Sequence, residues 1–332
     1  MSDPRLEYGW GERWVGFAAG RPCGRVVSEH RGFFDLVAAD GALLATVSGR
    51  MLHEAEDARD LPAVGDWVVH GEVDDEGRVR IDAVLDRRSA VVRRAAGLEA
   101  EPQVVAANVD VVLIVSSLDR DLNPRRIERY LAVVGASGAE PVIVLTKLDL
   151  ADDPSTMVAE VRRVAEDVDV LLVSNATGQG LETVRALVGA GTTVALLGSS
   201  GVGKSSMVNA LVGDDVLDIG EIRSDGKGRH TTTRRELIPM PGGGVLLDTP
   251  GMRELQLWDE ASLGDAFPEI EEAARSCRFA DCEHRTEPGC AVRAAVEAGE
   301  IRAERFASWR RLSDELAELA DEQELRRRRR RR

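Results

Sequence analysis

The sequence lacks the features of several protein classes. No apolar run approaches the 18 or more residues that a membrane span needs, and the first residues carry neither the basic start nor the apolar stretch of a secretory signal. Only four cysteines occur in 332 residues, and three of them lie within residues 277–290. This pattern excludes a disulfide-built scaffold and favours metal binding in a reducing compartment. We therefore expect a cytoplasmic protein with no membrane partner.

Lysine is also scarce. Only three of the 43 basic residues are lysines, namely Lys147, Lys204 and Lys227. A lysine is needed where a compact ammonium group on a flexible stem works and a planar guanidinium does not. All three lie in or near one candidate site, which is described below, so their positions support a shared role.

Positive charge is in deficit over most of the chain. The formal net charge is −15, and subtracting the +7 of the arginine run at residues 326–332 leaves −22 for the rest. Such a body cannot grip nucleic acid through its whole surface, so any contact with a polyanion must be local. The poly-Arg tail, residues 326–332, is either a disordered solubilising end or an arm that touches RNA or a membrane.

The N-terminal part is rich in short β-type runs separated by turn signals. Six predicted strands cover residues 26–27, 33–37, 43–47, 66–69, 79–85 and 90–92. So many short strands predict a small closed barrel within residues 1–95, of the OB type that binds oligonucleotides. An SH3-like barrel, or a barrel used only for protein contact, is the alternative. We expect residues 96–105 to be a linker.

The middle part alternates apolar runs with amphipathic segments. Strands buried on both faces are predicted at residues 109–115, 142–145, 170–173, 194–197 and 245–247, and helices at 125–134, 155–167, 181–188 and 204–212. This alternation predicts an α/β domain with a parallel sheet. After residue 262 strand signals vanish, and helices are expected at 291–298 and 301–325.

The strongest motif is GSSGVGKSS at residues 198–206, which matches the phosphate-binding loop G-x-x-x-x-G-K-[ST] between a strand and a helix. Its backbone N–H groups would bind phosphate oxygens at a helix N-terminus. Lys204 would reach the β- and γ-phosphates, and Ser205 would bind Mg²⁺. The expected contacts are Gly198, Ser199, Ser200, Gly201, Val202, Gly203, Lys204, Ser205 and Ser206.

Three other strand ends carry polar motifs. Asp149 of the TKLD motif can accept two hydrogen bonds from guanine, although a capped helix start is an alternative interpretation of TKLD. Asp248 of the DTPG motif would hold Mg²⁺ through water, and the Gly251 N–H would sense the γ-phosphate. The SNA motif would brace the base. The expected nucleotide contacts are Thr146, Lys147, Leu148, Asp149, Ser174, Ala176, Asp248 and Gly251.

This set of motifs resembles the translation-factor-like GTPases in permuted order, because TKLD precedes the phosphate loop. With the barrel, the GRHTTT segment at 228–233 and the terminal cysteines, residues 24–310 resemble the RsgA/YjeQ family of bacterial small ribosomal subunit biogenesis GTPases. The resemblance implies an OB-like barrel (1–95), a circularly permuted GTPase domain (96–255) and a helical zinc-binding domain (256–325). It also implies GTP hydrolysis to GDP with Mg²⁺, in late assembly of the 30S subunit and in contact with 16S rRNA.

Three cysteines and one histidine follow in a short segment, as Cys277, Cys282, His284 and Cys290. Three thiolates and an imidazole fill a tetrahedral zinc site and leave no position open for water, which predicts one structural Zn²⁺. The spacing differs from a simple C-x₂-C knuckle, so unligated thiols are the alternative, and the family pattern favours zinc.

The water that attacks GTP lacks its usual partner. Many GTPases carry Gln directly after D-x-x-G, and this chain has Met252 there. We expect His230, or a partner in trans, to position the water, with the 30S subunit stimulating turnover. His230 as a loop histidine without a catalytic role is the alternative. One of Thr231, Thr232 and Thr233, with Thr232 favoured, is expected to bind Mg²⁺ and sense the γ-phosphate. A monomer is the simplest expectation. The competing functions are a GTP-gated RNA- or ribosome-binding protein with negligible turnover and another P-loop nucleotide enzyme.

Overall fold

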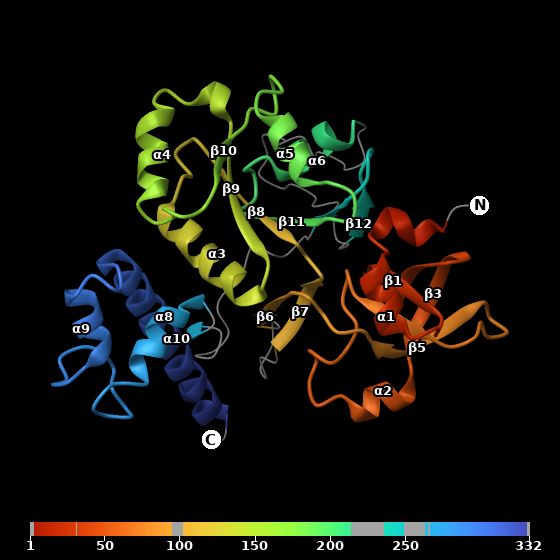
Figure 1. The fold of residues 1–332 in the computed structure, drawn as a ribbon, viewed down its shortest axis with the longest axis horizontal. Helices are drawn as coiled ribbons and strands as arrows, with labels where there is room; N and C mark the ends of the chain where they lie inside the picture. Colours follow the sequence, from red (N-terminus) through yellow and green to blue (C-terminus); the bar gives the residue numbers. More distant parts are fainter. Residues whose placement is uncertain are drawn as a thin grey trace.

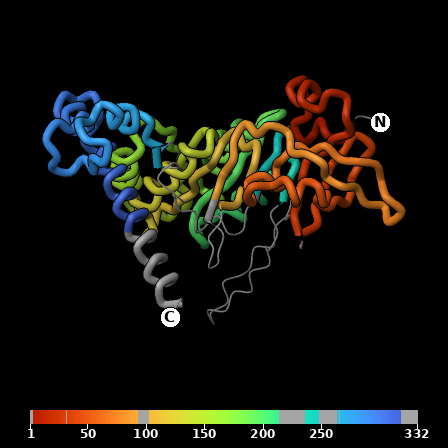
Figure 2. Tube along the Cα trace, turned by 90° about the horizontal axis from the view of Figure 1, so that it is seen from below, coloured from red at the N-terminus to blue at the C-terminus, as the bar shows by residue number. Residues whose placement is uncertain are grey.

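Three units lie side by side in the computed structural model, which describes residues 3–30, 32–94, 102–213, 236–248, 263–264 and 266–330. Figure 1 shows a β-barrel at the N-terminal end, an α/β unit in the centre and a helical unit at the C-terminal end. Seen at a right angle, the same three units still follow one another along the long axis (Figure 2). The fold is therefore multidomain, and the central unit contacts both others.

The first unit is a closed barrel of five strands: β1 (Cys23–His30), β2 (Phe33–Ala38), β3 (Gly41–Val47), β4 (Trp67–His70) and β5 (Arg78–Val84). The order is β1-β2-β3-β5-β4, and a β1–β4 pairing closes it. Strands β3 and β5 run parallel, and helix α2 (Gly49–Glu54) connects β3 to β4. This Greek-key topology is that of the OB fold, so the predicted closed barrel is confirmed.

A short segment precedes the barrel and covers one side of it. Helices η1 (Pro4–Tyr8) and α1 (Glu12–Ala18) place Trp14 against Trp67 of β4, with 5.7 Å between their ring centroids. Both indoles are almost fully buried. They bury enough apolar area to hold this segment against the sheet.

Two expectations about the end of the barrel are wrong. Strand β6 (Ala90–Arg94) does not join the barrel but pairs antiparallel with β7 (Pro102–Ala107) in a separate two-stranded sheet. Residues 102–105, predicted as the end of the linker at 96–105, are therefore part of strand β7. The ribbon buries Val91, Val104 and Val105 against neighbouring core residues. This tertiary packing decides the strand pairing, and local sequence signals do not report it.

The central sheet is parallel over five strands: β8 (Val111–Ser117), β9 (Glu140–Thr146), β10 (Val170–Leu172), β11 (Thr193–Leu197) and β13 (Val245–Asp248). Their order is β10-β9-β8-β11-β13, and each neighbouring pair is parallel, as the apolar runs predict. Strand β12 (Glu236–Pro239), which the sequence did not predict, is antiparallel to β13 and also pairs with β1 of the barrel. One continuous sheet therefore links the first two units.

Four helices cover the two faces of this sheet: α3 (Pro124–Ser137), α4 (Pro154–Arg162), α5 (Leu181–Leu187) and α6 (Lys204–Val212). Apolar residues of α3 and α4 share one core cluster, and those of α5 and α6 share the other. Asn123 accepts from the Arg126 N–H and caps α3 before Pro124, as predicted. Helix α4 ends at Arg162, five residues before its predicted end, because Val164 turns back to bond Val161.

The third unit consists of helices and turns over its described residues 263–264 and 266–330. Helices α8 (Pro268–Ala274), α9 (Ala291–Glu297) and α10 (Ala303–Arg330) surround the cysteine-rich loop. Helix α10 extends through most of the arginine run, beyond its predicted end at residue 325. Among the described helices, none has the length and apolar character that a bilayer span requires.

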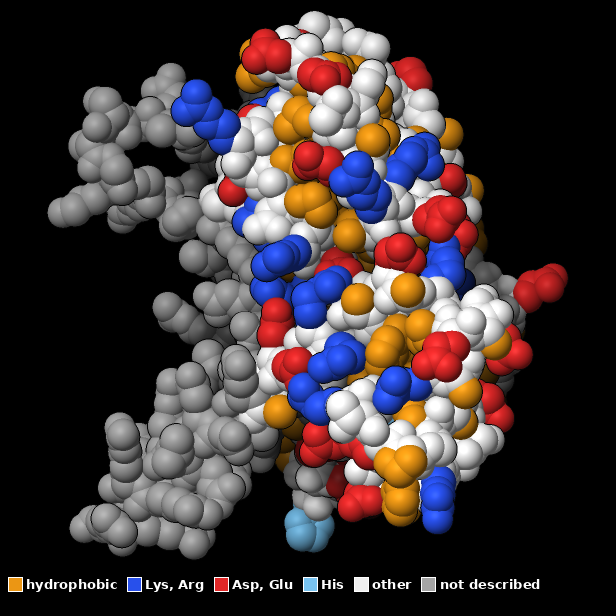
Figure 3. All heavy atoms as spheres, turned by 90° about the vertical axis from the view of Figure 1, so that its left-hand side faces the viewer, with side chains coloured by type: hydrophobic (Ala, Val, Ile, Leu, Met, Phe, Trp, Pro, Cys, Tyr) orange, Lys and Arg blue, Asp and Glu red, His pale blue; other side chains and the backbone are white. Residues whose placement is uncertain are grey.

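The outer face that includes this third unit carries mixed charge. Figure 3 shows Lys and Arg side chains interspersed with Asp and Glu over the described residues of that face. Several of these charges form ion pairs across units, such as Arg302 with Glu166 and Asp167, each at 2.5 Å. The mixed surface agrees with the argument from net charge that polyanion contact must be local.

Candidate nucleotide and metal sites

The phosphate loop lies at the carboxyl end of β11 and leads into α6. Gly198 has a φ of +156°, and a Cβ there would lie 2.2 Å from the Val115 carbonyl oxygen, so the loop needs glycine at its first position. Gly203, with a φ of +94°, precedes the first residue of α6. The loop residues 198–206 therefore surround the helix N-terminus, where a phosphate finds backbone donors and a favourable dipole.

The Lys204 ammonium group lies over this loop. Its Nζ donates to the carbonyl oxygens of Gly198 at 2.6 Å and Ser199 at 2.7 Å. These two carbonyls hold the cation at the mouth of the loop. Phosphate oxygens that enter the loop would reach the same cation, which fits the role predicted for Lys204.

The TKLD motif follows β9 at the same edge of the sheet. Lys147 adopts a left-handed conformation with a φ of +58°, so that the chain turns sharply after the strand. The Leu148 N–H bonds the Val173 carbonyl at 3.1 Å and holds the turn against the end of β10. The Asp149 carboxylate is exposed and accepts from the Ser174 hydroxyl at 2.5 Å. Ser174 of the SNA motif thus orients the carboxylate expected to bind guanine, whereas Ala176 is exposed.

Asp119 is a site residue that the sequence analysis missed. Its Oδ2 lies 2.8 Å from the Lys147 Nζ, and its Oδ1 accepts from the Ser117 hydroxyl and the Asp121 N–H. Burial acts to raise the pKa of Asp119, but the bonds from Lys147, Asp121 and Ser117 outweigh it, and the pKa is lowered. The carboxylate therefore stays charged and fixes Lys147. A polar residue just past the end of β8 was the available signal.

Two further bonds tie the strand ends to the phosphate loop. The Thr146 hydroxyl donates to the Val202 carbonyl at 2.5 Å, and the Asn175 Nδ2 donates to the Gly203 carbonyl at 2.9 Å. Asn175 was not among the expected contacts, although it lies between two residues that were. The TKLD and SNA motifs are thus joined to the phosphate loop by hydrogen bonds.

Part of the expected site lies outside the described residues. His230, Thr232, Gly251 and Met252 are in the ranges 214–235 and 249–262, and the side chain of Asp248 is likewise not described. Strand β13 ends at Asp248 and runs parallel to β11. Its backbone therefore reaches the same edge as the phosphate loop, which agrees with the place predicted for DTPG.

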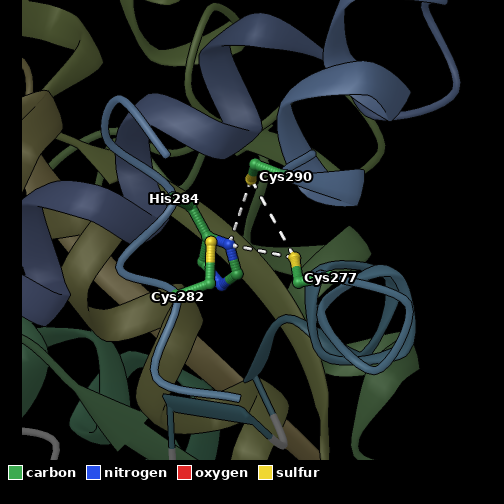
Figure 4. Close-up of side chains that lie close together, drawn as sticks. All are labelled: Cys277, Cys282, His284 and Cys290. Carbon is green, nitrogen blue, oxygen red and sulfur yellow. Dashed lines mark hydrogen bonds between the residues drawn. The ribbon is translucent and has the colours of Figure 1, made fainter. Parts of the chain in front are cut away.

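The cysteine and histidine side chains converge in the third unit. Figure 4 shows the side chains of Cys277, Cys282, His284 and Cys290 gathered around one point. Their ligand atoms all lie within 4.8 Å of one another. Cys277 Sγ is 4.0 Å from Cys290 Sγ and 3.6 Å from His284 Nδ1, which is 3.3 Å from Cys290 Sγ. Four ligands about 2.3 Å from a tetrahedral centre would lie about 3.8 Å apart. The cluster therefore fits a zinc ion.

The surroundings favour the metal-binding forms of Cys277 and His284, whereas burial and the neighbouring thiols raise the pKa of Cys282 to about 11. Burial acts to raise the pKa of Cys277, yet backbone N–H groups of Val292 and Ala291 lower it. Burial lowers the pKa of His284, which keeps the imidazole neutral and able to donate its lone pair. The Arg293 N–H lies 3.4 Å from Cys290 Sγ. These N–H groups at the start of α9 stabilise thiolate charge.

Comparisons with known proteins agree with this architecture. The family model described as RsgA GTPase matches residues 84–258. A small ribosomal subunit biogenesis GTPase RsgA of Opitutus terrae is 48% identical over 307 residues, covering 89% of this chain and 84% of that protein. The protein of the same name in Streptomyces coelicolor is 45% identical over 319 residues, covering 93% of this chain and 85% of that protein.

Two solved structures are also similar. The crystal structure of YjeQ from Thermotoga maritima has a TM-score of 0.64 and 28% identity, covering 90% of this chain and 99% of that one. YloQ, described as a circularly permuted GTPase, has a TM-score of 0.60 and 25% identity, covering 90% and 95%. Both cover the barrel, the sheet and the helical unit together, so the likeness extends over all three units.

Proposed function

This chain belongs to the RsgA GTPase family and is a GTP-hydrolysing enzyme of ribosome biogenesis, and from that premise we propose that it acts late in assembly of the 30S ribosomal subunit, which stimulates its turnover. The observation that carries the proposal is the connection of the phosphate loop to the guanine motif, with a barrel on one side and a Cys₃His cluster on the other. The barrel and the helical unit flank the nucleotide-binding unit, so each can contact the 30S subunit with its own surface.

The nucleotide is GTP before hydrolysis and GDP after it. The loop N–H groups and Lys204 bind the phosphates, and Asp149 reads the base while Ser174 orients it. Ser205, Thr232 and Asp248 would hold Mg²⁺, which would stabilise the charge that develops on the phosphates. In the transition state the Lys204 ammonium shifts from the carbonyls of Gly198 and Ser199 toward the phosphates.

Cys277, Cys282, His284 and Cys290 would hold one Zn²⁺. Four protein ligands would leave no position for water, so such a site would be structural. Metal binding would then help to fold the loop between α8 and α9 onto the rest of the helical unit.

We expect His230 to position the attacking water when the 30S subunit is bound. Met252 cannot supply a side-chain amide for this role. Placement of a catalytic group in trans is worth on the order of 10³ to 10⁵ in rate among GTPases. The protein works in the cytoplasm as a monomer and contacts 16S rRNA through local basic patches.

Hydrolysis of GTP and of ATP, each with and without purified 30S subunits and at two salt concentrations, tests the function. We expect GTP turnover that rises at least about tenfold with subunits at low salt and less at high salt. Lys204→Ala is the inactive control. His230→Ala should lose most of the stimulated rate and keep its affinity for GTP.

The two alternatives give different results in this experiment. A GTP-gated binding protein would bind subunits only with GTP and show negligible turnover in every mixture. Another P-loop enzyme would hydrolyse ATP as readily as GTP and ignore the subunits. Equal stimulation of the His230 variant would assign the water to another residue.

A further inference from the structure

The carboxamide of Asn175 occupies an unusual place between two loops. Its Nδ2 donates to the Gly203 carbonyl oxygen at 2.9 Å, and that same oxygen accepts the Met207 N–H at 2.9 Å in the first turn of α6. A Cβ at Gly203 would lie only 2.9 Å from the Asn175 Nδ2. The Asn175 side chain thus contacts the backbone immediately before Lys204, the residue expected to bind the phosphates.

The environment of the Asn175 amide oxygen indicates why the amide has this orientation. Asn175 Oδ1 is buried and has no hydrogen-bond partner among the described residues. Reversing the amide would place that oxygen against the Gly203 carbonyl, and two acceptors at such a distance repel each other. A buried acceptor without a partner costs free energy, so the amide is held in this orientation for the bond that its nitrogen makes.

Thr146 acts on the neighbouring carbonyl. Its hydroxyl donates to the Val202 oxygen at 2.5 Å, so two consecutive carbonyls of the phosphate loop are bonded by side chains from the ends of two other strands. Thr146 begins the motif that contains Asp149, and Asn175 follows Ser174, the residue that orients Asp149. The base-binding carboxylate and the phosphate loop therefore share both supports.

We propose that Asn175 is a positioning residue for the nucleotide, whose amide N–H holds the phosphate loop in register with the guanine-binding Asp149. The inference rests on the assignment of this site to a guanine nucleotide. Asn175 acts through Gly203 and Ser174 and does not touch the reacting atoms. Its loss lets the two halves of the site move independently, so binding of base and phosphates together becomes weaker.

Affinity for GDP, measured on the isolated protein without ribosomal subunits, tests this role. Asn175→Ala should weaken GDP binding by about tenfold, the usual value of one such bond. Asn175→Asp keeps the shape but turns an acceptor toward the Gly203 oxygen, so it should bind GDP more weakly than the Ala variant. A role in filling space alone predicts the reverse order, with the Asp variant close to the wild type, and that result would overturn the proposal.

The matched control is Gln179→Ala, which removes an exposed carboxamide from the same loop. The Gln179 backbone carbonyl bonds the Ser174 N–H and is unchanged by the substitution. We expect wild-type affinity for GDP. A loss equal to that of Asn175→Ala would show a general effect of the loop and remove the specific role.

A double-mutant cycle supplies a second measurement that does not depend on the Asp variant. Asn175→Ala and Thr146→Val act on adjacent carbonyls of one loop, so their effects on GDP affinity should be non-additive by at least about threefold. Strict additivity would overturn the coupling. Absence of GDP binding in the wild type would instead contradict the nucleotide assignment itself, and failure of 30S stimulation would leave this inference intact.

Discussion

The Arg25 guanidinium joins the barrel to the nucleotide domain, because its Nη2 donates to the Thr193 hydroxyl at 2.8 Å. Thr193 is the first residue of β11, the strand that leads into the phosphate loop. Arg25 is only 2% exposed and also donates to the carbonyls of Gly65 and Tyr8. Burial lowers its pKa to about 10, so the group remains charged at neutral pH. One side chain thus connects three segments of the chain.

Replacing this arginine should separate those segments. Arg25→Met keeps much of the apolar stem but removes the donor to the Thr193 hydroxyl and the Tyr8 carbonyl, while the Gly65 carbonyl keeps its bond from Asn108 Nδ2, so we expect a loss of about 2 kcal/mol in the free energy of unfolding. Urea denaturation followed by circular dichroism measures it. The control is Arg80→Met on the exposed side of the barrel, expected to stay within about 0.5 kcal/mol of the wild type. An equally small effect at Arg25 would show that the joint is held by other contacts.

Base preference should follow the chemistry of residue 149. Asp149→Asn presents an amide N–H where xanthine has a carbonyl and guanine an amine, so affinity should shift from guanine to xanthine nucleotides by about tenfold or more. Competition between GDP and xanthosine diphosphate measures the shift. Asp152→Asn changes an exposed carboxylate three residues away and should leave the preference alone. An unchanged preference in Asp149→Asn would remove this carboxylate from base recognition.

Ser174 offers a milder test of the same site. Ser174→Ala removes the hydroxyl that bonds Asp149 at 2.5 Å and accepts the Thr177 N–H at 3.1 Å. We expect weaker binding of guanine nucleotides, by about fivefold to tenfold, with no gain for xanthine. A switch in base preference would mean that Ser174 itself reads the base.

The sequence predicts those parts of the fold that local chemistry controls. The start of α3 can be predicted from local sequence. The Asn123 side chain accepts a hydrogen bond from a free N–H of the first turn, and the proline after it favours the first helical position. The closed barrel and the parallel sheet follow from strand length and apolar pattern. Strands β7 and β12 escape prediction because partners far away in the chain create them: β7 pairs with β6, and β12 lies between β13 and β1.

The same division applies to the site. Motifs of fixed spacing place Lys204, Asp149 and the four zinc ligands, because each type of side chain matches one chemical task. Asp119 and Asn175 belong to no such motif. Their roles depend on which loops meet across the edge of the sheet, and only the structure shows that Asp119 contacts Lys147 and that Asn175 contacts Gly203.

Removal of the metal should loosen the helical unit and spare the nucleotide site. A strong chelator, or Cys290→Ala, should abolish binding of one zinc per chain and lower the cooperativity of unfolding of this unit. Acid should release the metal as well, because protons compete for the thiolates. GDP affinity should change by less than about twofold, since Val202 of the phosphate loop and the apolar residues of α6 pack in a core cluster that contains none of the four ligands. Cys23→Ala, outside the cluster, is the control for zinc content measured by elemental analysis.

The contact between α3 and α10 provides the last prediction, because it is how the zinc-binding unit is held to the nucleotide domain. Glu128 on α3 is 8% exposed, and both of its oxygens accept from Arg311 Nη2, at 2.6 and 2.7 Å. The Ser308 hydroxyl bonds the same carboxylate. Since the Arg311 side chain is 46% exposed, water screens the pair, and we expect a coupling energy of about 1 kcal/mol.

A double-mutant cycle of Glu128→Gln and Arg311→Gln on urea unfolding measures that coupling. The pair Arg275 and Glu272, exposed on both sides and within one helical turn, is the control and should show almost none. Helix α3 starts a few residues after Asp119, and Asp119 bonds Lys147 of the TKLD motif. A movement of α10 that displaces α3 would therefore also affect the position of TKLD. We therefore expect Arg311→Gln to weaken stimulation by 30S subunits more than it weakens GDP binding. Additive effects in the cycle, together with unchanged stimulation, would show that the Glu128–Arg311 pair does not couple the helical unit to the α/β unit, which other contacts such as those of Arg302 would then hold.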